Sequence, residues 1–434
     1  MNLESSPSPS PSPLPDRVEV VIVGAGLAGL AAARGVEAAG RTAVVVEASD
    51  GVGGRVRTDE VDGFRLDRGF QVLLTAYPEV GRQLDLAALR PCAFDPGSLV
   101  WLGKRMYAIG DPTRRPSMLF SSALAPVGSV IDKVRLAAML HRLRKTDPVS
   151  LLHREDVSTL TALRDLGFST RIIDRFFRPL LGGIQLDADL SASRRMADII
   201  LRCLAVGDSV VPAMGMQAIP DQLAAGLLPG TVQLGCPAAT VAPGEVRLAD
   251  GRIVHGARVV VATEGPVAAG LLRDRQVASP GSRKVSCVWF AAPKPPVDGK
   301  LIILDGTSGM NGAIFGPALN VAVMSNVSPH YAPEGQALIA AACPAVEGDR
   351  AALPDAVRAQ MRRWWGAQVD EWRVLRTDTI AHGQPDSQPP FAPKKPVALG
   401  EGLFVCGDHR DTPSIQGALY SGHRTAQAVL ASLG

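Results

Sequence analysis

A glycine-rich turn between two apolar segments constrains this chain more than any other feature. The apolar run Val18–Val23 is followed at once by Gly24, Gly26 and Gly29, with the spacing G-x-G-x-x-G, and an alanine-rich stretch comes next. A second apolar run ends on Glu47, about 20 residues after the glycines. A strand, a glycine turn, a helix and a strand that ends on an acid are typical of the βαβ unit that binds dinucleotides.

Each residue of this unit has a physical task. Gly24 permits a tight turn, Gly26 lets the backbone approach a pyrophosphate, and Gly29 lets helix and strand pack closely. The helix, predicted over Leu27–Ala39, turns its free N–H groups and positive dipole end toward the phosphates. Glu47 can accept a hydrogen bond from a ribose hydroxyl, and its charge disfavours the 2′-phosphate of NADP. The predicted contacts are Gly24, Gly26, Leu27, Ala28, Gly29, Glu47 and Ala48.

A second glycine-rich segment follows the acid. It reads Gly53-Gly54-Arg55-Val-Arg-Thr and then, from residue 63, G-F-R-L-D-R-G. Here the chain resembles the flavin-containing amine oxidase superfamily, which includes monoamine and polyamine oxidases, phytoene desaturases and protoporphyrinogen oxidase. The resemblance implies that Gly53, Gly54 and Arg55 lie along the pyrophosphate of FAD. An NAD dehydrogenase has no need of this second phosphate-binding segment.

The C-terminal region resembles the same superfamily. A buried-strand pattern, Leu403 to Cys406, ends in Gly407-Asp408, and Pro413 to Ala418 lead into a helical stretch over Leu419–Leu430. The resemblance implies that Asp408 meets the ribityl or pyrophosphate region. It also implies that N–H groups of the helix start face the flavin N1/C2 edge, where they would stabilise negative charge on reduced flavin. The predicted contacts are Gly407, Asp408, Ser414, Ile415, Gln416 and Ala418.

Two segments in the middle of the chain complete the resemblance. The turn from Ala213 to Pro220 is similar to the family's G-G-M-x-x-(I/L)-P sequence, with Met214 in place of one glycine. Further along, Ala238 precedes an alternating strand and an Asp250-Gly251 hairpin signal. The resemblance implies backbone contacts from Ala238 to adenine, although valine is the usual residue there.

These motifs are far apart in sequence, so the residues between them must form a second unit. We predict an α/β fold with a Rossmann-like FAD-binding domain of the GR2 type and a discontinuous second α+β substrate domain. We assign the FAD-binding domain to 16–78, 205–275 and 400–434, and the substrate domain to 79–204 and 276–399. Residues 1–15 are rich in Ser and Pro, cannot form a core and are predicted to be a disordered tail.

Composition excludes several classes of protein. The chain has 434 residues, 46% of them apolar, and a net charge of +3 with scattered basic residues, which gives no case for nucleic-acid binding. Its six cysteines are far apart, without CxxC or Cys/His metal spacing, so we expect reduced thiols, no metal site and a cytoplasmic location. We expect no membrane span, because no apolar run reaches 18 residues.

Two segments of the substrate domain each allow two readings. Residues 131–145 predict an amphipathic helix with Leu136, Met139, Leu140 and Leu143 on one face. That face could lie on an anionic membrane surface and admit a lipid substrate, or it could pack on a core. The segment from Arg175 to Gly183 resembles desaturases and protoporphyrinogen oxidase, and its residues Phe176 and Phe177 could be core or substrate wall.

The resemblance also implies the reaction. In this superfamily hydride passes from a substrate C–H bond to flavin N5, which gives an imine from a C–N bond or an alkene from a C–C bond. Amine oxidases hold the amine between two aromatic rings, but the matching positions here are Ser414 and the stretch Gly383–Pro390, which has no aromatic residue. That stretch also lacks the cysteine that binds flavin covalently, so FAD should be non-covalent. Lys284 is a weak candidate for the lysine near N5.

We therefore predict an FAD-dependent oxidoreductase that dehydrogenates a small apolar substrate, with oxygen or a quinone as electron acceptor and peripheral membrane contact as an open option. One alternative is an amine oxidase that forms an imine. Another is a non-catalytic binding protein like the GDP-dissociation inhibitors, which the intact Gly53-Gly54-Arg55 and Gly407-Asp408 motifs disfavour. The sequence leaves the substrate and the oligomeric state open.

Overall fold

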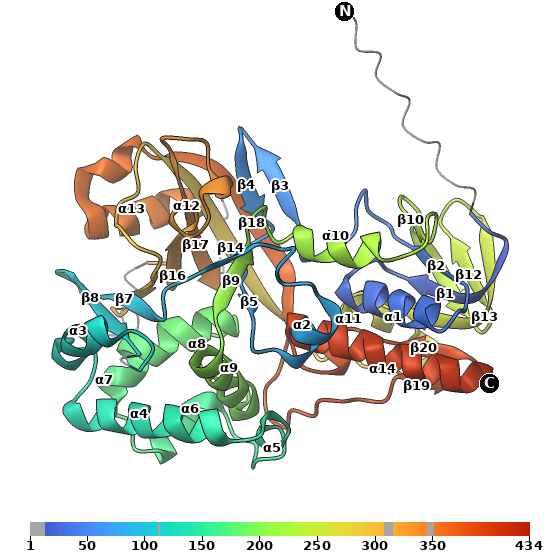
Figure 1. Cartoon of the computed structure of the whole chain (residues 1–434), viewed down its shortest axis with the longest axis horizontal. Helices are drawn as coiled ribbons and strands as arrows, with labels where there is room; N and C mark the ends of the chain where they lie inside the picture. The colour runs from blue at the N-terminus through green and yellow to red at the C-terminus, as the bar shows by residue number, and fades with distance from the viewer. Residues whose placement is uncertain (1–13, 112, 308–315, 345–350) are drawn as a thin grey trace, which may run out of the picture.

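The computed structural model describes residues 14–111, 113–307, 316–344 and 351–434 (Figure 1). The predicted Ser/Pro-rich tail, 1–15, lies almost wholly outside the described residues. Along the long axis of the molecule, a parallel sheet with its helices occupies one end, and a layer of helices beneath a second sheet occupies the other (Figure 1).

The first sheet has a parallel core in the order β10-β2-β1-β13-β20. These strands are β1 (Arg17–Val23), β2 (Ala43–Val46), β10 (Val232–Gln233), β13 (Ile253–Val261) and β20 (Leu403–Val405). The side chains at the centre of these strands, Val20–Val23, Val44–Val46, Val259–Val261 and Leu403–Val405, are buried, as expected for a parallel sheet with both faces covered. Antiparallel strands extend its edges, namely β11 (Ala238–Ala242), β12 (Glu245–Leu248) and β19 (Ala398–Gly400).

Helices α1 and α14 pack against each other beside this sheet (Figure 1). The helices of this end are α1 (Leu27–Ala38), α2 (Pro78–Gln83), α10 (Ala218–Ala225), α11 (Gly265–Leu271) and α14 (Ile415–Leu433). Helix α14 begins four residues earlier than the sequence predicts, because the Ser414 hydroxyl accepts a hydrogen bond from the Gly417 N–H at 3.0 Å and caps the helix there.

The second sheet has seven strands in the order β18-β14-β17-β16-β15-β7-β8 and is antiparallel except where β15 meets β7. Its strands are β7 (Gly97–Trp101), β8 (Met106–Gly110), β14 (Ser282–Ala292), β15 (Ile302–Asp305), β16 (Asn320–Val323), β17 (Ala337–Pro344) and β18 (Arg373–Pro385). One face packs on helix α13 (Leu353–Trp365) in a separate apolar cluster, and α12 (Met324–Val327) follows β16.

Two small sheets and a helical layer complete the fold. The small sheets are the hairpin of β3 (Thr58–Val61) and β4 (Phe64–Asp67), and the set β5 (Leu73–Leu74), β9 (Ser209–Pro212) and β6 (Pro91–Ala93). The helical layer contains α3 (Leu119–Leu124), α4 (Val130–Lys145), α5 (Pro148–Leu151), α6 (Thr159–Asp165), α7 (Thr170–Ile172), α8 (Arg178–Ile184) and α9 (Arg194–Val206). The α/β prediction with a Rossmann-like unit is confirmed, whereas the division into domains stays a prediction.

Helix α4 shows where the predicted apolar face of residues 131–145 lies. Met139 and Leu143 are buried, and Leu136 and Leu140 pack beside them against the apolar cluster of the helical layer. Met139 and Leu143 are therefore core residues, whereas Leu136 and Leu140 also line a cavity. Whether Phe176 and Phe177 belong to the core or to a substrate wall has a different answer for each ring. Phe177 is fully buried in this cluster, while Phe176 also lines a cavity.

Candidate flavin and substrate site

One cavity of about 1400 Å³ runs from the glycine turns of the first sheet to the helical layer. Pockets for a single small ligand usually measure about 300–1,000 Å³, so this cavity has room for more than one ligand-sized group. Of the predicted cofactor contacts, it is lined by Gly24, Gly26, Leu27, Ala28, Glu47, Ala48, Gly53, Gly54, Arg55, Gly407, Asp408, Ser414, Ile415 and Ala418.

The two glycine-rich segments contact each other at one end of the cavity. Gly26 and Gly53 form a parallel bridge, and the Gly53 N–H donates to the Ala25 carbonyl at 2.8 Å. A Cβ atom placed on Gly26 would meet nothing within 4 Å, so the space before this backbone is open. A phosphate could therefore approach both segments, as the motif spacing predicts.

Gly29 has a different task from its two neighbours in the motif. A Cβ atom there would lie 1.9 Å from the Gly24 carbonyl oxygen and 3.2 Å from the Ala262 side chain. No L side chain fits so close to backbone, so this glycine permits the contact between α1 and the sheet. Gly29 does not line the cavity, and its predicted contact with a ligand has no support in its position.

Glu47 ends β2 at the cavity wall. One carboxylate oxygen accepts from the Ala25 N–H at 2.6 Å, and the other accepts from the N–H and hydroxyl of Ser49 at 2.9 and 2.8 Å. These bonds hold the carboxylate beside the glycine turn. A carboxylate has about four acceptor sites, so Glu47 can still accept from a ribose hydroxyl.

An ion pair joins the second glycine segment to the C-terminal motif. The Arg55 guanidinium donates to the Asp408 carboxylate at 2.8 Å and to the Gly383 carbonyl at 3.1 Å. The Asp408 side chain is almost buried, and both residues line the cavity. Desolvation is the largest single effect and would lower the pKa of Arg55, but the charge and hydrogen bond of Asp408, together with the charge of Glu264, raise that pKa overall. The predicted pyrophosphate contacts are thus brought together from opposite ends of the chain.

The start of α14 supplies a second helix N-terminus to the same cavity. Ser414, Ile415 and Ala418 line the wall, so N–H groups and the positive dipole end lie at this position. Gln416 does not line the cavity, because its side chain turns toward α2 and accepts a hydrogen bond from the Glu79 N–H at 2.9 Å. The predicted contact of Gln416, through its backbone N–H at the helix start, stays a prediction.

Two further predicted residues lie away from the cavity. Ala238 begins the edge strand β11, two residues after Cys236, whose N–H donates to the Glu47 carbonyl at 2.7 Å. It is thus near the acid of the motif but not on the cavity wall. Lys284 lies on β14 with its side chain exposed, whereas Val285, which points to the other face, lines the cavity. Strand alternation turns Lys284 away from the position that the resemblance implies.

Asp67 is a residue whose importance sequence reasoning missed. It is fully buried and accepts hydrogen bonds from the Thr58 hydroxyl, the Met216 N–H and the Tyr331 hydroxyl at 2.5, 3.0 and 2.8 Å. Burial raises the pKa of Asp67 to about 6. The sequence signal for Asp67 is the acid of the G-F-R-L-D-R-G segment, although that segment alone does not reveal its distant partners Met216 and Tyr331.

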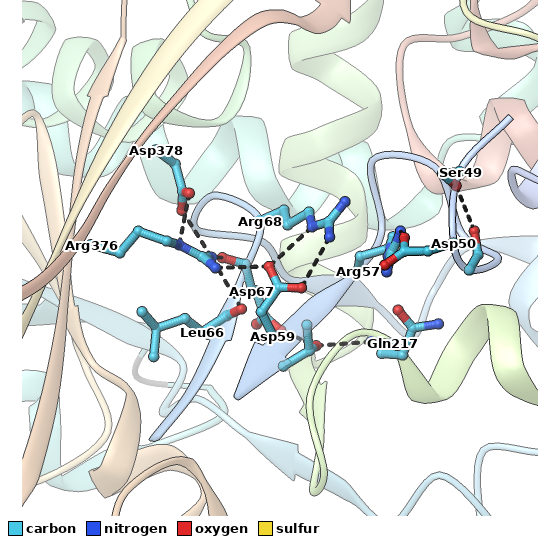
Figure 2. A network of polar contacts seen from close by, with 12 residues as sticks. Ser49, Asp50, Arg57, Asp59, Leu66, Asp67, Arg68, Gln217, Arg376 and Asp378 are labelled. Carbon is cyan, nitrogen blue, oxygen red and sulfur yellow. Dashed lines mark hydrogen bonds and ion pairs between the residues drawn. The ribbon is translucent and has the colours of Figure 1, made fainter. Parts of the chain in front are cut away.

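Arg376 of β18 extends this buried connection (Figure 2). Its guanidinium donates to Asp59 at 2.7 Å and to the Leu66 and Asp67 carbonyls, and it also pairs with Asp378. Hairpin β3–β4 is therefore fixed to the second sheet by Arg376 and to the turn at Met216 by Asp67. The network thus joins the hairpin, the second sheet and the turn at Met216.

The far part of the cavity is walled by apolar side chains of several helices, including Leu140, Phe176, Leu180, Ile200 and Leu204. The amine-cage positions bring Ser414, Gly383, Gln384 and Ser387 to the wall, none of them aromatic. Aromatic rings reach the cavity elsewhere, and Phe70 and Phe94 meet edge to face at 6.2 Å.

The cavity arginines are neutralised by acids. Arg68, Arg114 and Arg144 each form an ion pair with an aspartate. Among the described residues, no group of three or more His, Cys, Asp or Glu side chains could hold a metal ion.

A parallel sheet, two glycine segments and two helix N-termini at one cavity define a dinucleotide-binding α/β protein. The model of the flavin containing amine oxidoreductase family matches residues 27–430, and the chain belongs to that family. The resemblance seen in the sequence is thereby confirmed, as is a flavin cofactor at the level of the family.

Relatives with different substrates share parts of this sequence. Putrescine oxidase of Kocuria rosea is 35% identical over 127 residues, which are 29% of this chain and 25% of the relative. Phytoene dehydrogenase of Streptomyces griseus is 31% identical over 236 residues, covering 47% of this chain and 45% of the relative. Both alignments span less than half of the relative's length, so the activity of either protein is not carried over by similarity alone.

The fold has a structural relative over almost its whole length. An oxidoreductase from Methanosarcina mazei matches with a TM-score of 0.71 at 18% identity, covering 95% of this chain and 100% of that one. This likeness shows that the two proteins share a fold.

Proposed function

We propose that this protein is an oxidoreductase that binds FAD non-covalently and dehydrogenates a small apolar substrate. The observation that carries the proposal is the continuity of the cavity, which joins the glycine segments to a wall of aliphatic and aromatic side chains. Bound FAD would supply the acceptor for a hydride from a substrate C–H bond.

The residues present fit FAD. The open backbone at Gly26 and the N-terminus of α1 would receive the pyrophosphate, and Glu47 would accept from the ribose. The Arg55–Asp408 pair would meet the phosphate or ribityl region, and the start of α14 would stabilise negative charge on the ring. No described cysteine lies in the stretch Gly383–Pro390, which supports a non-covalent cofactor.

The apolar wall favours carbon–carbon over carbon–nitrogen oxidation. A protonated amine needs aromatic faces or free carboxylates around it. Ser414, Gly383 and Gln384 provide neither at the positions where the family's amine oxidases carry their cage. Oxygen or a quinone would take the electrons from reduced flavin.

The same proposal includes the location of the protein. All six cysteines are free thiols, which supports a cytoplasmic compartment. No helix of the described residues is long and apolar enough to cross a bilayer. Because an apolar substrate partitions into lipid, we include peripheral contact with a membrane in the proposal.

The visible absorption spectrum tests the cofactor first, before and after acid precipitation. We expect flavin bands that move to the supernatant when the protein precipitates. Colour that stays with the pellet would mean a covalent flavin, and a colourless protein that FAD cannot reconstitute would overturn the proposal. Candidate substrates are then added to the protein in the absence of oxygen, and the loss of flavin absorbance is followed. Amines are compared with partly saturated polyenes and cyclic hydrocarbons. If only amines bleached the flavin, the reaction would be amine oxidation and not the oxidation of a carbon–carbon bond that we propose.

A further inference from the structure

Large apolar side chains are exposed together in one short stretch of the helical layer. They belong to α3 and the first turns of α4, and each is 51–80% exposed: Leu119, Phe120, Leu124, Val130, Ile131 and Val134. We call these six residues the α3–α4 patch. Other exposed large apolar side chains of the described residues are spread from Val149 to Val267. A contiguous apolar patch of this kind marks an interaction surface.

The local structure holds the patch outward. Ser129 and Asp132 form a capping box, in which the Asp132 N–H donates to the Ser129 hydroxyl at 3.1 Å and the Asp132 carboxylate accepts from the Ser129 N–H at 2.8 Å. The same carboxylate accepts from the Ser169 N–H and hydroxyl at 2.9 and 2.7 Å. The start of α4 is thus fixed, with Asp132 inward and its apolar neighbours outward.

The patch lies at an exposed part of the cavity. Leu119, Val130 and Val134 are exposed to solvent and also line the cavity. Phe120, Leu124 and Ile131 are exposed but do not line it. In Figure 1, α3 and α4 lie at the end of the molecule away from β1, β2 and β10. The mouth among these helices is therefore remote from the glycine segments.

The cations around the patch have no acidic partner among the described residues. Lys133 donates to the Ala123 carbonyl, Arg135 to the Gly167 carbonyl and Arg175 to the Pro126 carbonyl, at 2.5, 2.5 and 2.6 Å. No ion pair joins these three cations, or the exposed Arg171 beside Arg175, to a carboxylate. The arginines that line the cavity, by contrast, all have aspartate partners.

We propose that the α3–α4 patch docks on an anionic lipid bilayer, so that an apolar substrate passes from the bilayer through the mouth into the cavity. Apolar side chains that enter the acyl boundary and cations that meet lipid phosphates are the combination that interfacial helices use. A second copy of this chain fits less well, because a symmetric contact would bring two sets of unpaired cations together. The docking surface stands on its own geometry, and only the nature of the passing substrate rests on the proposed function.

Vesicle sedimentation tests the docking with purified holoprotein. We expect binding to vesicles of phosphatidylcholine with phosphatidylglycerol, and weaker binding to phosphatidylcholine alone. The triple variant Phe120→Ser, Leu124→Ser, Ile131→Ser should bind roughly a hundredfold more weakly, because three side chains no longer enter the apolar phase. Arg171→Gln should cost about fivefold on anionic vesicles and little on neutral ones.

The matched control is Leu228→Ser, which removes an equally exposed leucine from the other end of the molecule and should bind as the parent does. Phe120→Trp and Leu228→Trp add a local probe at each place. Brominated lipids should quench the added fluorescence of the first variant and not of the second.

Three outcomes would overturn the docking. They are no binding of the parent to either vesicle, equal losses in the triple variant and the control, and a dimer that the triple variant converts to monomer without any vesicle binding. The flavin spectrum of each sample separates this test from the proposed function. A yellow protein that ignores vesicles refutes only the docking, and a colourless protein that binds them refutes only the cofactor.

Discussion

The two ends of the cavity are built from different materials. The end predicted to bind the cofactor consists mainly of backbone, at the glycine segments and at the starts of α1 and α14. The other end consists of side chains such as Phe176, Leu180 and Ile200, which come from three consecutive stretches of the helical layer. A site made of backbone depends on a few spacings, whereas a site made of side chains depends on how whole helices pack.

Substitution of Gly26 should have the largest effect on FAD binding and tests the backbone-built end most directly. Its Cβ space is open, so Gly26→Val should fold normally while it blocks the approach of the pyrophosphate. We expect FAD binding to weaken by more than about 3 kcal/mol, over a hundredfold, and the protein to purify colourless. Flavin absorbance per protein chain measures the effect.

Gly81→Val is the matched control, because Gly81 is an exposed helix residue whose Cβ space is also open. It should remain yellow. A yellow Gly26→Val protein would show that the cofactor lies elsewhere. Glu47→Ala should also give apoprotein, but it removes the hydrogen bonds from Ala25 and Ser49 as well and so tests the site less cleanly.

Two adjacent rings test the side-chain-built end. Phe177 is fully buried in the apolar cluster, so Phe177→Ala should lower the free energy of unfolding by about 3–5 kcal/mol. Phe176 lines the cavity, so Phe176→Ala should lower the free energy of unfolding less than Phe177→Ala and should mainly change KM for the substrate. Denaturant titration of both variants checks this, and equal losses would place both rings in the core.

The buried network around Asp67 should make stability sensitive to pH. Burial raises the pKa of Asp67 to about 6, and an unfolded aspartate titrates near 3.9. Between those values the folded state binds more protons, so this group makes stability fall as pH rises from about 4 to 6, by roughly 3 kcal/mol. Asp67→Asn should remove that part of the slope in thermal unfolding. In this variant Asp411 still makes stability depend on pH, because burial raises the pKa of Asp411 to about 6 as well.

The ion pair between Arg55 and Asp408 should have a smaller effect on stability. Asp408→Asn removes the charge that faces Arg55 at 2.8 Å in a mostly buried place, so stability should fall by about 2 kcal/mol. Asp50→Asn is the control, because Asp50 is exposed where it pairs with Arg57, and it should leave the melting temperature unchanged. Equal behaviour of the two variants would mean that the Arg55 pair is a surface contact.

Lys284 gives the smallest expected effect. Lys284→Met should leave turnover largely intact, because the side chain is exposed and lies off the cavity. Steady-state turnover and the rate of flavin bleaching measure this. A loss of bleaching with FAD still bound would restore the lysine as a catalytic group.

Most of the backbone-built end could be predicted because its determinants are local. Strand β1 and helix α1 each differ from the predicted range by one residue at one end. Gly26, Glu47 and Arg55 reach the cavity wall because spacing alone carries them there. Lys284 does not reach the wall, since the direction of its side chain depends on which face of β14 is turned to the cavity.

The side-chain-built end could not be predicted in the same way. The periodicity of α4 identified its buried face correctly, but not that Val130, Ile131 and Val134 would be exposed on the other face. The role of Asp67 depends on Tyr331 and Met216, which no local pattern connects to it. Such contacts are set by tertiary packing, which a single sequence does not display.

The packing of α14 on α1 has a consequence for how the protein is made. A Cβ atom on Gly422 would lie 2.2 Å from the Ala28 carbonyl oxygen, so the two helices meet backbone to backbone beside the glycine turn. Ribosomes release α1 early and α14 only after almost all of the described sequence. A nascent chain therefore carries the glycine turn without Asp408 or Ser414, and flavin insertion becomes a step that follows translation. Chains that stop before α14 would accumulate without colour, whatever the supply of flavin in the cell.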